Sequence, residues 1–408
     1  MKSRGTDFCR LCSGQLGETI LSLGSQPLSN GLPMNGGELE SDEFPLDFRI
    51  CPSCSMGQIG EYVSPQGIFK DYTYFSSTSL SWLKHAEGFA SSAFTQLQLT
   101  PQDLVLEIAS NDGYLLQYFQ LLGTKVLGIE PAENVAQQAI LSGIPTQVEF
   151  FGTESAQKLL ESKIVPKLVV CNNVLAHVPD IDDFMSGLAK LIRAGAIVSI
   201  EAPSLKIMLQ NGLFDTIYHE HFSYLSVTAV DRLARKHEVA LQHVELLSTH
   251  GGSYRFWIKS GNEQREKSVE IHLEEERLFG ITDLAVHSRF AKNSKKAILN
   301  FREWCLGQDL LPIGFGAAAK ATVMLNAARV TRQHFECIAD NALAKQNRIV
   351  PGVKIPIYSP SQVLSMVDRN LVIFPWNIAD EIASEITLKF PEFMGQIWTA
   401  LPEMRRLR

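Results

Sequence analysis

The most reactive group of side chains lies near the middle of the chain, in the run Tyr218-His219-Glu220-His221. An imidazole is a base near neutral pH, a carboxylate can orient it, and a phenol can donate to a developing oxyanion. In an extended segment Tyr218 and Glu220 would face one side and the histidines the other, so a turn is needed to gather all four. The i, i+2 spacing of the histidines does not match the i, i+4 spacing of helical zinc-protease sites. A capped loop with stacked aromatic rings is the alternative, non-catalytic interpretation.

A second group of candidate residues surrounds the apolar run Leu104 to Ile108, which we expect to be a strand. Asp112 and Gly113 lie in the turn after it, and Glu130 ends the next apolar run. In such a βαβ unit the first turn faces a ligand, and an acid ending the second strand can accept both hydroxyls of a ribose. The Gly-x-Gly-x-x-Gly pattern of dinucleotide sites is missing, because only Gly113 is present. Glu107 and Asp112 would repel a pyrophosphate but suit the cationic S-adenosylmethionine, so the pattern favours a methyltransferase over a dehydrogenase.

Four of the seven cysteines form two Cys-x-x-Cys pairs, Cys9 with Cys12 and Cys51 with Cys54. Pairs at this spacing can place four thiolates around one tetrahedral Zn²⁺ ion. The residues between the pairs are rich in Gly, Pro, Ser and Asn and would bury little without such a staple. We therefore predict a structural zinc site with no catalytic role. Two unrelated pairs, or a redox dithiol, are the alternative.

His177 is a further candidate, because it follows the apolar run Leu168 to Cys171. We expect that run to be a buried parallel strand. Residues just past the carboxyl end of such a strand lie at the ligand crevice of a doubly wound sheet. A lone histidine is more often structural, so position alone leaves its role open. Asp180 or Asp182 can cap the helix expected next.

An aromatic and hydroxyl cluster runs from Tyr72 to Ser79, just before a helix expected to begin near Ser81. Its serines and threonines can cap that helix. Its tyrosines have the further option of projecting into a cleft between the front lobe and the nucleoside-binding domain.

Together these features resemble the nucleotide-sugar C-methyltransferases that alkylate 4-keto-6-deoxy sugars. The resemblance covers nearly the whole chain, and it departs at Ala109, where the family usually carries Gly and where Ala needs a negative φ or some strain. The matching segments are the four cysteines, Tyr72-x-Tyr74-x-Ser76-Ser77, Glu107 to Gly113, Asn173-x-x-Ala176-His177, Tyr218 to Ser226, Gly251-Gly252-Ser253-x-Arg255, Gly314-x-Gly316-Ala-Ala-Ala-Lys320, and Asp340-Asn341 through Pro356.

The resemblance implies a set of site residues. The implied catalytic residues are His221 as base, with Tyr218, Glu220, His177 and Tyr72 around the ketone. The residues implied for S-adenosylmethionine are Glu107, Asn111, Asp112, Gly113, Glu130 and Asn172. The residues implied for the nucleotide sugar are Tyr74, Ser76, Tyr224, Arg255 and Lys320.

The chain is 408 residues long, which is too long for one core, and we expect an α/β protein of three domains. These are a small zinc-binding domain at 1–75, a Rossmann-like S-adenosylmethionine methyltransferase domain at 76–243, and a second Rossmann-like domain at 244–408. In the last domain Leu311 to Lys320 predicts a strand, a glycine turn and a helix start, a geometry that can hold the nucleotide of the substrate. Alternatively, Gly314 and Gly316 only allow close helix packing.

Charge and hydropathy exclude several classes of function. The formal net charge of −7 argues against a dedicated nucleic-acid binder. We find no run long and apolar enough to cross a bilayer and no signal peptide. We therefore expect a cytoplasmic enzyme that acts on a small molecule, without nucleic acid, membrane or obligate protein partner.

The predicted reaction, on this resemblance, is S-adenosylmethionine-dependent C-methylation of a nucleotide-bound 4-keto-6-deoxy sugar, at C3, through an enolate, in branched deoxysugar biosynthesis. O- or N-methylation of a related nucleotide sugar is one alternative. A non-catalytic nucleotide-binding zinc protein is another, and the intact cluster of Tyr218, Glu220, His221 and His177 argues against it. The identity of the nucleotide and the choice between C3 and C5 stay open.

Overall fold

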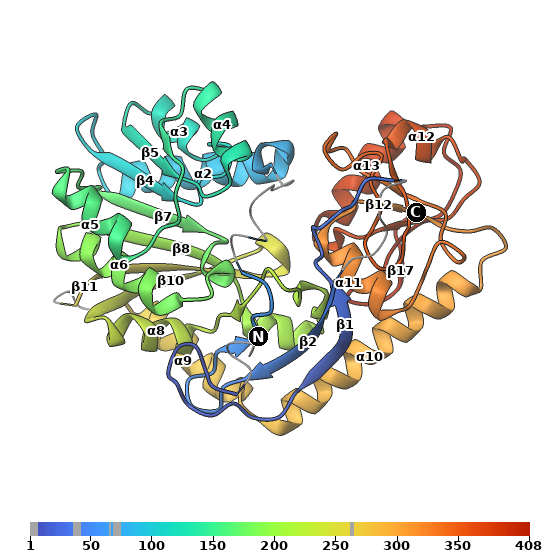
Figure 1. Ribbon diagram of the computed structural model, residues 1–408, viewed down its shortest axis with the longest axis horizontal. Helices are drawn as coiled ribbons and strands as arrows, with labels where there is room; N and C mark the ends of the chain where they lie inside the picture. The colour runs from blue at the N-terminus through green and yellow to red at the C-terminus, as the bar shows by residue number, and fades with distance from the viewer. Residues whose placement is uncertain (1–6, 36–41, 65–66, 68–74, 262–264) are drawn as a thin grey trace.

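The computed structural model describes residues 7–35, 42–64, 67, 75–261 and 265–408, and within these ranges the strands form three sheets (Figure 1). The first sheet belongs mainly to the N-terminal lobe, and its last strand comes from the middle of the chain. Its strands, in spatial order, are β1 (Leu21–Pro27), β2 (Glu43–Ile50), β3 (Gly57–Gln58) and β9 (Ser223–Tyr224), all antiparallel.

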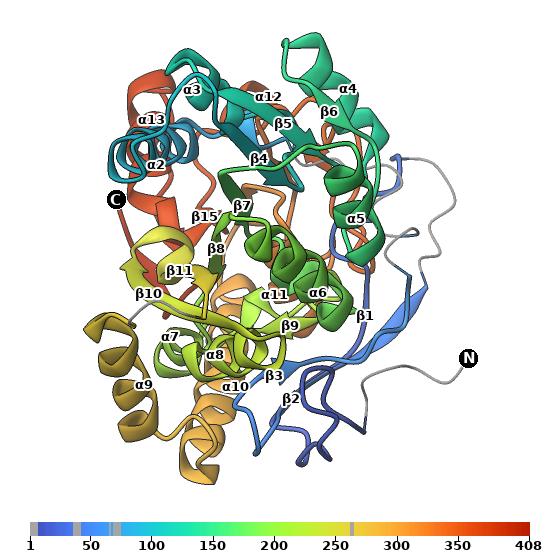
Figure 2. The same cartoon turned by 90° about the vertical axis from the view of Figure 1, so that its left-hand side faces the viewer.

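The second sheet is a twisted, mostly parallel sheet at the centre of the middle domain (Figure 2). Its strands, in spatial order, are β10 (Val239–Leu247), β11 (Ser253–Ser260), β8 (Ile197–Pro203), β7 (Leu168–Asn172), β4 (Leu104–Ile108), β5 (Lys125–Ile129) and β6 (Thr146–Gln147). The strands from β8 to β6 are parallel, whereas β11 and β10 extend the sheet as an antiparallel hairpin. The predicted domain boundary at 243/244 thus falls inside β10, because this hairpin completes the sheet through its pairing with β8.

Helices cover both faces of this sheet, because successive apolar side chains of each strand point to opposite faces. Leu106 and Val169 belong to one core cluster, and Val105 and Val170 belong to another. The first face is packed by α5 (Thr153–Glu161), α6 (Ile181–Arg193), α8 (Val227–Lys236) and α9 (Lys267–Phe279), and the second by α2 (Leu80–Gln96), α3 (Leu116–Leu121) and α4 (Glu133–Leu141).

Side-chain caps fix the start of two of these helices, as the sequence predicts. The Ser79 side chain accepts a hydrogen bond from the backbone N–H of Trp82 at the start of α2. The Asp180 side chain accepts one from the backbone N–H of Asp183 at the start of α6.

The third sheet belongs to the C-terminal domain and is parallel except at its last strand. Its strands, in spatial order, are β14 (Ile357–Tyr358), β13 (Ile338–Ala339), β12 (Ile313–Phe315), β15 (Leu371–Ile373), β16 (Ile397–Thr399) and β17 (Arg405–Arg406). Its helices are α10 (Leu284–Leu306), α11 (Ala319–Ala327), α12 (Pro360–Leu364) and α13 (Ala379–Lys389). The predicted α/β class, with a Rossmann-like middle domain and a further parallel-sheet domain, is confirmed.

The N-terminal lobe joins the two α/β bodies, because its strands β1 and β2 run along α10 and α11 (Figure 1). Phe48 of β2 contacts the ring of Tyr224 at 5.0 Å and that of Phe290 on α10 at 6.0 Å between centroids. The three domains therefore share one apolar cluster, which also includes α7 (Leu205–Asn211). In the described ranges, every helix is too short or too polar to span a bilayer.

Candidate active site

Glu130, which follows the neighbouring strand β5, is a buried acid that binds the turn after β4. Glu130 is only 4% exposed, and its two oxygens accept the backbone N–H groups of Asn111 at 2.9 Å and Ala132 at 2.8 Å. Burial raises its pKa, although these two backbone donors favour the ionised form. Glu130 therefore fixes the shape of the turn, and an acid at this position of a βαβ unit is the residue type that accepts the hydroxyls of a ribose.

Two further carboxylates beside this turn have buried oxygen atoms that are not fully satisfied. Both oxygens of Glu107, and Oδ1 of Asp112, make no hydrogen bond of ordinary geometry within the described part of the chain. Burial raises the pKa of Glu107 well above its usual range, and the charges of Asp112 and Glu130 raise it further, although the Tyr114 side chain acts to lower it. A buried carboxylate is costly unless a cation or donor meets it. The ammonium and sulfonium groups of S-adenosylmethionine are such partners, so these residues fit that cofactor.

The turn itself holds a strained backbone. Ala109 has φ of 53° and Asn111 has φ of 50°, both in the left-handed region. Ala109 therefore keeps the conformation that Gly would adopt, and of the two possibilities expected there, strain is the one observed. The cost is about 1–2 kcal/mol for a residue with a Cβ atom.

The segment before α2 closes over this turn. The backbone N–H of Ser76 donates to Asn111 Oδ1 at 2.8 Å, and Ser77 Oγ donates to Asp112 Oδ2 at 2.5 Å. Ser76, expected to contact the sugar nucleotide, is thus held against the cofactor turn. Tyr72 and Tyr74 lie outside the described residues.

Tyr218 and His221 form a hydrogen-bonded pair, because a turn closes between them. The backbone N–H of His221 donates to the carbonyl oxygen of Tyr218 at 2.9 Å. The Tyr218 hydroxyl then lies 2.7 Å from His221 Nε2, and His221 Nδ1 lies 3.0 Å from the carbonyl oxygen of Thr216. A carbonyl only accepts, so Nδ1 carries the proton and Nε2 accepts from Tyr218. The Tyr224 hydroxyl donates to the same Thr216 carbonyl at 3.4 Å and so helps to fix the acceptor of His221 Nδ1.

His177 lies against this pair, with its ring centroid 4.6 Å from that of His221. Burial lowers the pKa of His177 to about 4. Burial, with the neighbouring His177, lowers the pKa of His221 well below its usual range. Both imidazoles are therefore uncharged at neutral pH, and the structure brings together the predicted residues His177, Tyr218 and His221.

Glu220 and His219 hold the N-terminal lobe. Glu220 Oε1 accepts the backbone N–H of Asn30 at 3.1 Å, and burial raises the Glu220 pKa. His219 Nε2 lies 3.2 Å from the carbonyl oxygen of Phe44 and 3.3 Å from that of Pro45, both on β2. The segment is therefore not extended: a turn pairs Tyr218 with His221, whereas His219 and Glu220 contact the N-terminal lobe.

Lys320 brings a cation from the C-terminal domain. Its ammonium lies 4.1 Å from the ring centroid of Trp376 and 3.4 Å from Asn377 Oδ1. The Trp376 indole donates to Asp215 Oδ2 at 2.7 Å, which ties η5 (Trp376–Ile378) to η3 (Phe214–Thr216). Burial lowers the pKa of Lys320, whereas the Asp215 carboxylate raises it. The charge of Lys320 also contributes to the low pKa of His221.

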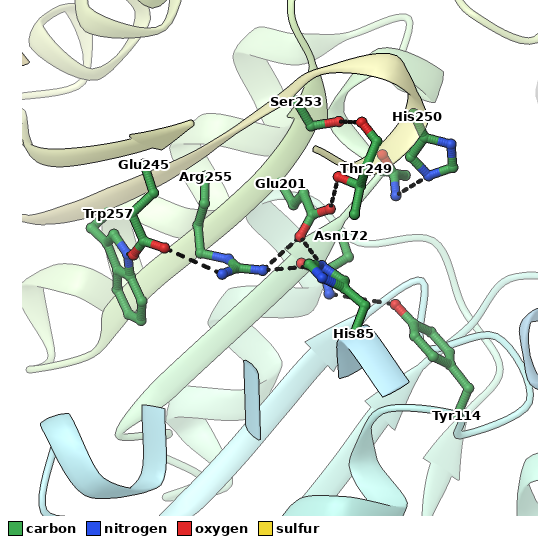
Figure 3. Close-up of polar contacts among 11 residues, drawn as sticks. His85, Tyr114, Asn172, Glu201, Glu245, Thr249, His250, Ser253, Arg255 and Trp257 are labelled. Atoms are coloured by element: carbon green, nitrogen blue, oxygen red, sulfur yellow. Dashed lines mark hydrogen bonds and ion pairs between the residues drawn. The ribbon is translucent and has the colours of Figure 1, made fainter. Parts of the chain in front are cut away.

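Arg255 takes part in a network inside the protein (Figure 3). Its guanidinium donates to Glu201 Oε2 at 2.7 Å, and its carbon lies 4.1 Å from the ring centroid of Phe89. His85 Nε2 meets the same Glu201 oxygen at 2.8 Å. Arg255 is only 5% exposed, and the structure does not bring it to the Tyr218–His221 pair. The expected contact between Arg255 and substrate thus finds no support in its surroundings, because its sheet partners bind it.

Asn172 ends β7 and lies on the cofactor side of the crevice. Its Nδ2 donates to the Tyr114 hydroxyl at 3.5 Å, and its Oδ1 is buried without a partner in the described ranges. Gly113, in the turn, has φ of 80°, and a Cβ there would lie 2.8 Å from Ile144. Glycine is therefore required at position 113 both by conformation and by space.

The C-terminal domain repeats the carboxylate arrangement of the cofactor turn. Asp340 ends β13, and its oxygens accept the backbone N–H groups of Ala317 and Ala342, each at 2.8 Å. Lys345 Nζ donates to the carbonyl oxygen of Ala317 at 3.0 Å. A Cβ at Gly314 would lie 2.8 Å from Phe374, and one at Gly316 would overlap Pro375. These two glycines are thus needed for packing against residues at strand ends rather than against a helix, and Gly316, with φ of 87°, also has the conformation of the expected glycine turn.

The four paired cysteines converge, with all four Sγ atoms within 4.8 Å of one another. Cys9 Sγ lies 3.5 Å from Cys54 Sγ, and Cys12 Sγ lies 3.5 Å from Cys51 Sγ, with no disulfide between them. Zinc–sulfur bonds of about 2.3 Å in a tetrahedron require such spacings. The four thiolates therefore fit a closed structural zinc site.

The zinc knuckles also support the segment that follows His221. β3 begins three residues after Cys54 and pairs with β9, which begins two residues after His221. Arg10, between Cys9 and Cys12, donates through Nη1 to the carbonyl oxygen of Phe222 at 2.9 Å. The four cysteines and His221 are thus joined through one short ladder.

A relative from Streptomyces niveus, the C-methyltransferase NovU, is 30% identical over 408 residues, covering 98% of this chain and 97% of the relative. The chain belongs to the C-methyltransferase family. Family models match this C-methyltransferase over 9–69 as a zinc binding domain, over 84–244 as a methyltransferase domain, and over 248–402 as a C-methyltransferase C-terminal domain. The enzyme is therefore an S-adenosylmethionine-dependent C-methyltransferase with a zinc-binding N-terminal lobe.

Other similarities of this C-methyltransferase are partial. A ubiquinone biosynthesis O-methyltransferase from Rhizobium etli is 27% identical over 148 residues, covering 34% of this chain and 57% of the relative. Magnesium protoporphyrin IX methyltransferase from Synechocystis PCC 6803, solved with bound SAH, covers 44% of this chain and 83% of its own, at 16% identity and a TM-score of 0.33.

Sequence reasoning missed two residues of this C-methyltransferase that lie beside the crevice. Asn173 and His250 are in contact, with Asn173 Nδ2 3.3 Å from His250 Nε2, and both have left-handed backbone conformations. The signal available in the sequence was His250 directly before Gly251-Gly252, a histidine in a tight turn. Sequence alone could not place that turn against the end of β7.

Loss of the metal should loosen the ladder that supports His221. We expect Cys12→Ser to lower bound zinc well below one ion per chain and to lower kcat by about 100-fold, since a displacement of about 1 Å at a reacting group can cost that much. Metal content is measured by plasma mass spectrometry and SAH affinity by calorimetry, and the affinity should change less than about threefold because the cofactor turn is built by other residues. Cys305→Ser, at a buried cysteine of α10 outside the cluster, is the control. Full kcat in a zinc-free Cys12→Ser variant would contradict the proposed support.

Proposed function

We propose that this C-methyltransferase methylates a carbon next to the ketone of a nucleotide-bound 4-keto-6-deoxy sugar, at C3, with His221 as the base that forms the enolate. The observation that carries the proposal is the Tyr218–His221 pair at 2.7 Å, with His177 packed against it. A phenol and an uncharged imidazole in contact are the two groups that enolate formation needs, a donor for oxygen and an acceptor for the proton.

The proposed proton transfer involves only these side chains. The Tyr218 hydroxyl turns from His221 Nε2 to the ketone oxygen and donates to it. The lone pair of Nε2 then takes the proton from the neighbouring carbon, and the electron pair of the C–H bond moves to the enolate oxygen. Bound S-adenosylmethionine supplies an electrophilic methyl group. The Thr216 carbonyl, 3.0 Å from Nδ1, stabilises the imidazolium that His221 becomes.

Electrostatics support an uncharged resting base. Burial and His177 lower the pKa of His221, so the imidazole is free to accept a proton when substrate arrives. A protonated histidine would also repel a sulfonium methyl donor. The phosphates of a sugar nucleotide are negative and would raise the pKa of His221 once bound, which strengthens it as a base.

The C-terminal domain supplies the cations that a nucleoside diphosphate needs. Lys320 faces the crevice from α11, and Lys345 lies beside the Asp340 turn. Because Gly314 and Gly316 are explained by packing, the argument for nucleotide binding here depends on Lys320 and on the Asp340 arrangement rather than on the glycines. Arg255 is left out of this assignment.

Membership in a C-methyltransferase family favours carbon over oxygen or nitrogen as the acceptor. An acceptor hydroxyl or amine would need a base but no donor to an enolate oxygen. The Tyr218 hydroxyl is placed as such a donor, and the non-catalytic alternative gives no reason for an uncharged imidazole pair.

Product analysis tests the reaction. With S-adenosylmethionine and a panel of 4-keto-6-deoxy nucleotide sugars, we expect one substrate to gain a methyl group on carbon, identified by mass spectrometry and NMR. In deuterated water without methyl donor, we expect deuterium to enter the same carbon. A methyl group found on oxygen or nitrogen, or no product from any member of the panel, would overturn the proposal.

Replacement of the base tests its assignment. We expect His221→Ala to lower kcat by about 10²- to 10⁴-fold, the usual contribution of a general base, and to abolish deuterium entry. SAH affinity by calorimetry should stay within about twofold, because His221 does not line the cofactor turn. His243→Ala, at a histidine of β10 that contacts Ser268 and Glu266, is the matched control. Unchanged turnover in His221→Ala would reject His221 as the base.

The pH profile tests the hydrogen bond between the pair. Because the pKa of His221 lies below its ordinary value of 6.5, we expect the acid limb of kcat/KM below pH 6.5. Tyr218 donates to the lone pair of neutral His221 and so favours the uncharged form; Tyr218→Phe should raise the pKa of His221 and move the acid limb to higher pH. Tyr118→Phe, on α3, serves as control. An acid limb that moves downward in Tyr218→Phe would contradict the assigned donor and acceptor.

A further inference from the structure

His250 lies in a rigid, strained loop between β10 and β11. Its backbone, with φ of 53°, is left-handed and departs from the helical conformation of the surrounding 3-10 turn η4 (Thr249–Gly251). The Thr249 hydroxyl donates to Glu201 Oε1 at 2.8 Å, and Ser253 Oγ donates to the Thr249 carbonyl at 3.0 Å (Figure 3). Glu201 is itself held by Arg255. Strain of this kind persists only where the surroundings enforce it, and it is concentrated at functional sites.

The imidazole of His250 lies apart from the bonds around Glu201 in Figure 3. Its partner is the side-chain amide of Asn173. Asn173 Nδ2 lies 3.3 Å from His250 Nε2 and donates to it, so Nε2 is the acceptor and Nδ1 carries the proton. No acceptor among the described residues lies within hydrogen-bonding distance of Nδ1. His250 is half-buried, so it lies at the edge of the packed interior, and within the described ranges this N–H is left for a ligand.

The groups around His250 come from both sides of the crevice. Its ring centroid lies 5.3 Å from that of Trp82, and Trp82 stacks on Tyr114, which contacts Asn172 on the cofactor side. On the other side, the adjacent Gly251 packs against Trp376, because a Cβ at Gly251 would overlap that ring, and Lys320 Nζ lies 4.1 Å from the ring centroid. The loop of His250 therefore lies between residues beside the cofactor turn and the lysine of the C-terminal domain.

An uncharged donor suits that place. Burial and Lys320 lower the pKa of His250 to about 4, so at neutral pH its Nδ1–H donates without a positive charge. A cationic donor would oppose both the sulfonium group of the cofactor and the protonation of His221. A neutral N–H can bind a hydroxyl or carbonyl oxygen at no such cost.

We infer that His250 is a substrate-binding residue whose Nδ1–H donates a hydrogen bond to an oxygen of the bound sugar, and that Asn173 is the positioning residue that fixes this tautomer. The inference rests on the proposed function for the identity of the ligand. The tautomer itself depends only on the contact between Asn173 and His250.

Two substitutions at His250 distinguish the loss of the hydrogen-bond donor from a loss of folded structure. Asparagine places its Nδ2–H group near the position of histidine Nδ1 and tolerates the left-handed backbone, whereas alanine has no donor. We expect His250→Ala to raise the KM for the sugar nucleotide about tenfold, the loss of one hydrogen bond, and His250→Asn to stay within about threefold of the wild type. SAH affinity should stay within about twofold in both, because a lost substrate contact leaves the cofactor turn intact. Thermal unfolding checks that both variants fold.

NMR of the protein labelled with ¹⁵N-histidine reads the tautomer without any substrate. The signal that disappears in His250→Asn should show Nδ1 protonated. In Asn173→Asp a carboxylate replaces the amide donor and accepts from Nε2–H, so the tautomer should reverse and the KM should rise as in His250→Ala.

The outcomes distinguish the two proposals. If the wild type methylates no sugar nucleotide, the proposed function fails, and the ligand assigned to His250 fails with it. If the wild type gives product and His250→Ala keeps the wild-type KM, only the role of His250 is overturned. An Nε2-protonated His250 in the wild type would overturn the role of Asn173.

Discussion

The active site depends on a two-residue antiparallel ladder between β3 and β9. One strand follows the last zinc ligand, and the other follows His221. A ladder this short has little stability of its own. It is reinforced at the Phe222 carbonyl, which accepts from Arg10 and from the backbone of Ile59. The small N-terminal lobe thus helps to hold the Tyr218–His221 turn in place. Its strand β2 packs into the shared apolar cluster through Leu46, Phe48 and Ile50, and the four cysteines fix the chain at the start of the ladder.

The two sides of the crevice have opposite electrostatic character. On the cofactor side, buried carboxylates keep oxygen atoms without a hydrogen bond in the described ranges and favour an incoming cation. On the other side, His177, His221 and His250 are uncharged, and desolvation is the leading cause of each lowered pKa. Lys320 adds positive charge at the edge, from a different domain. The arrangement separates a site for a positive ligand from one for an oxygen-rich, negative ligand within a short distance.

Local sequence patterns predicted the parts that depend on local structure. The cysteine spacing indicated a metal site because two short knuckles need only be brought together, and the structure gathers all four sulfurs. The apolar run before Glu107 and the acid at Glu130 indicated a βαβ turn, and Glu130 accepts the backbone of Asn111 as such an acid does. Ser79 and Asp180 cap their helices for the same local reasons.

The parts that depend on long-range packing could not be predicted in the same way. Period-2 alternation separates Tyr218 from His221, and only the turn that β9 and the N-terminal lobe impose brings them together. Arg255 lies in a motif whose spacing gives no sign that Glu201, from another strand, binds it. Predicting that His250 lies at the site would have required knowing which strand ends are neighbours in the sheet. The predicted boundary at 243/244 divides a hairpin whose pairing partner, β8, precedes it in the chain by about forty residues.

Phe48 gives the clearest view of how the domains are joined. Its ring touches Tyr224 beside the active site and Phe290 on the long helix α10, while Phe48 itself belongs to the N-terminal lobe. The three parts of the chain therefore are not interchangeable modules. A recombinant chimera that takes its C-terminal third from a relative would have to import the matching partner of Phe48, or leave an unfilled void beneath the catalytic turn.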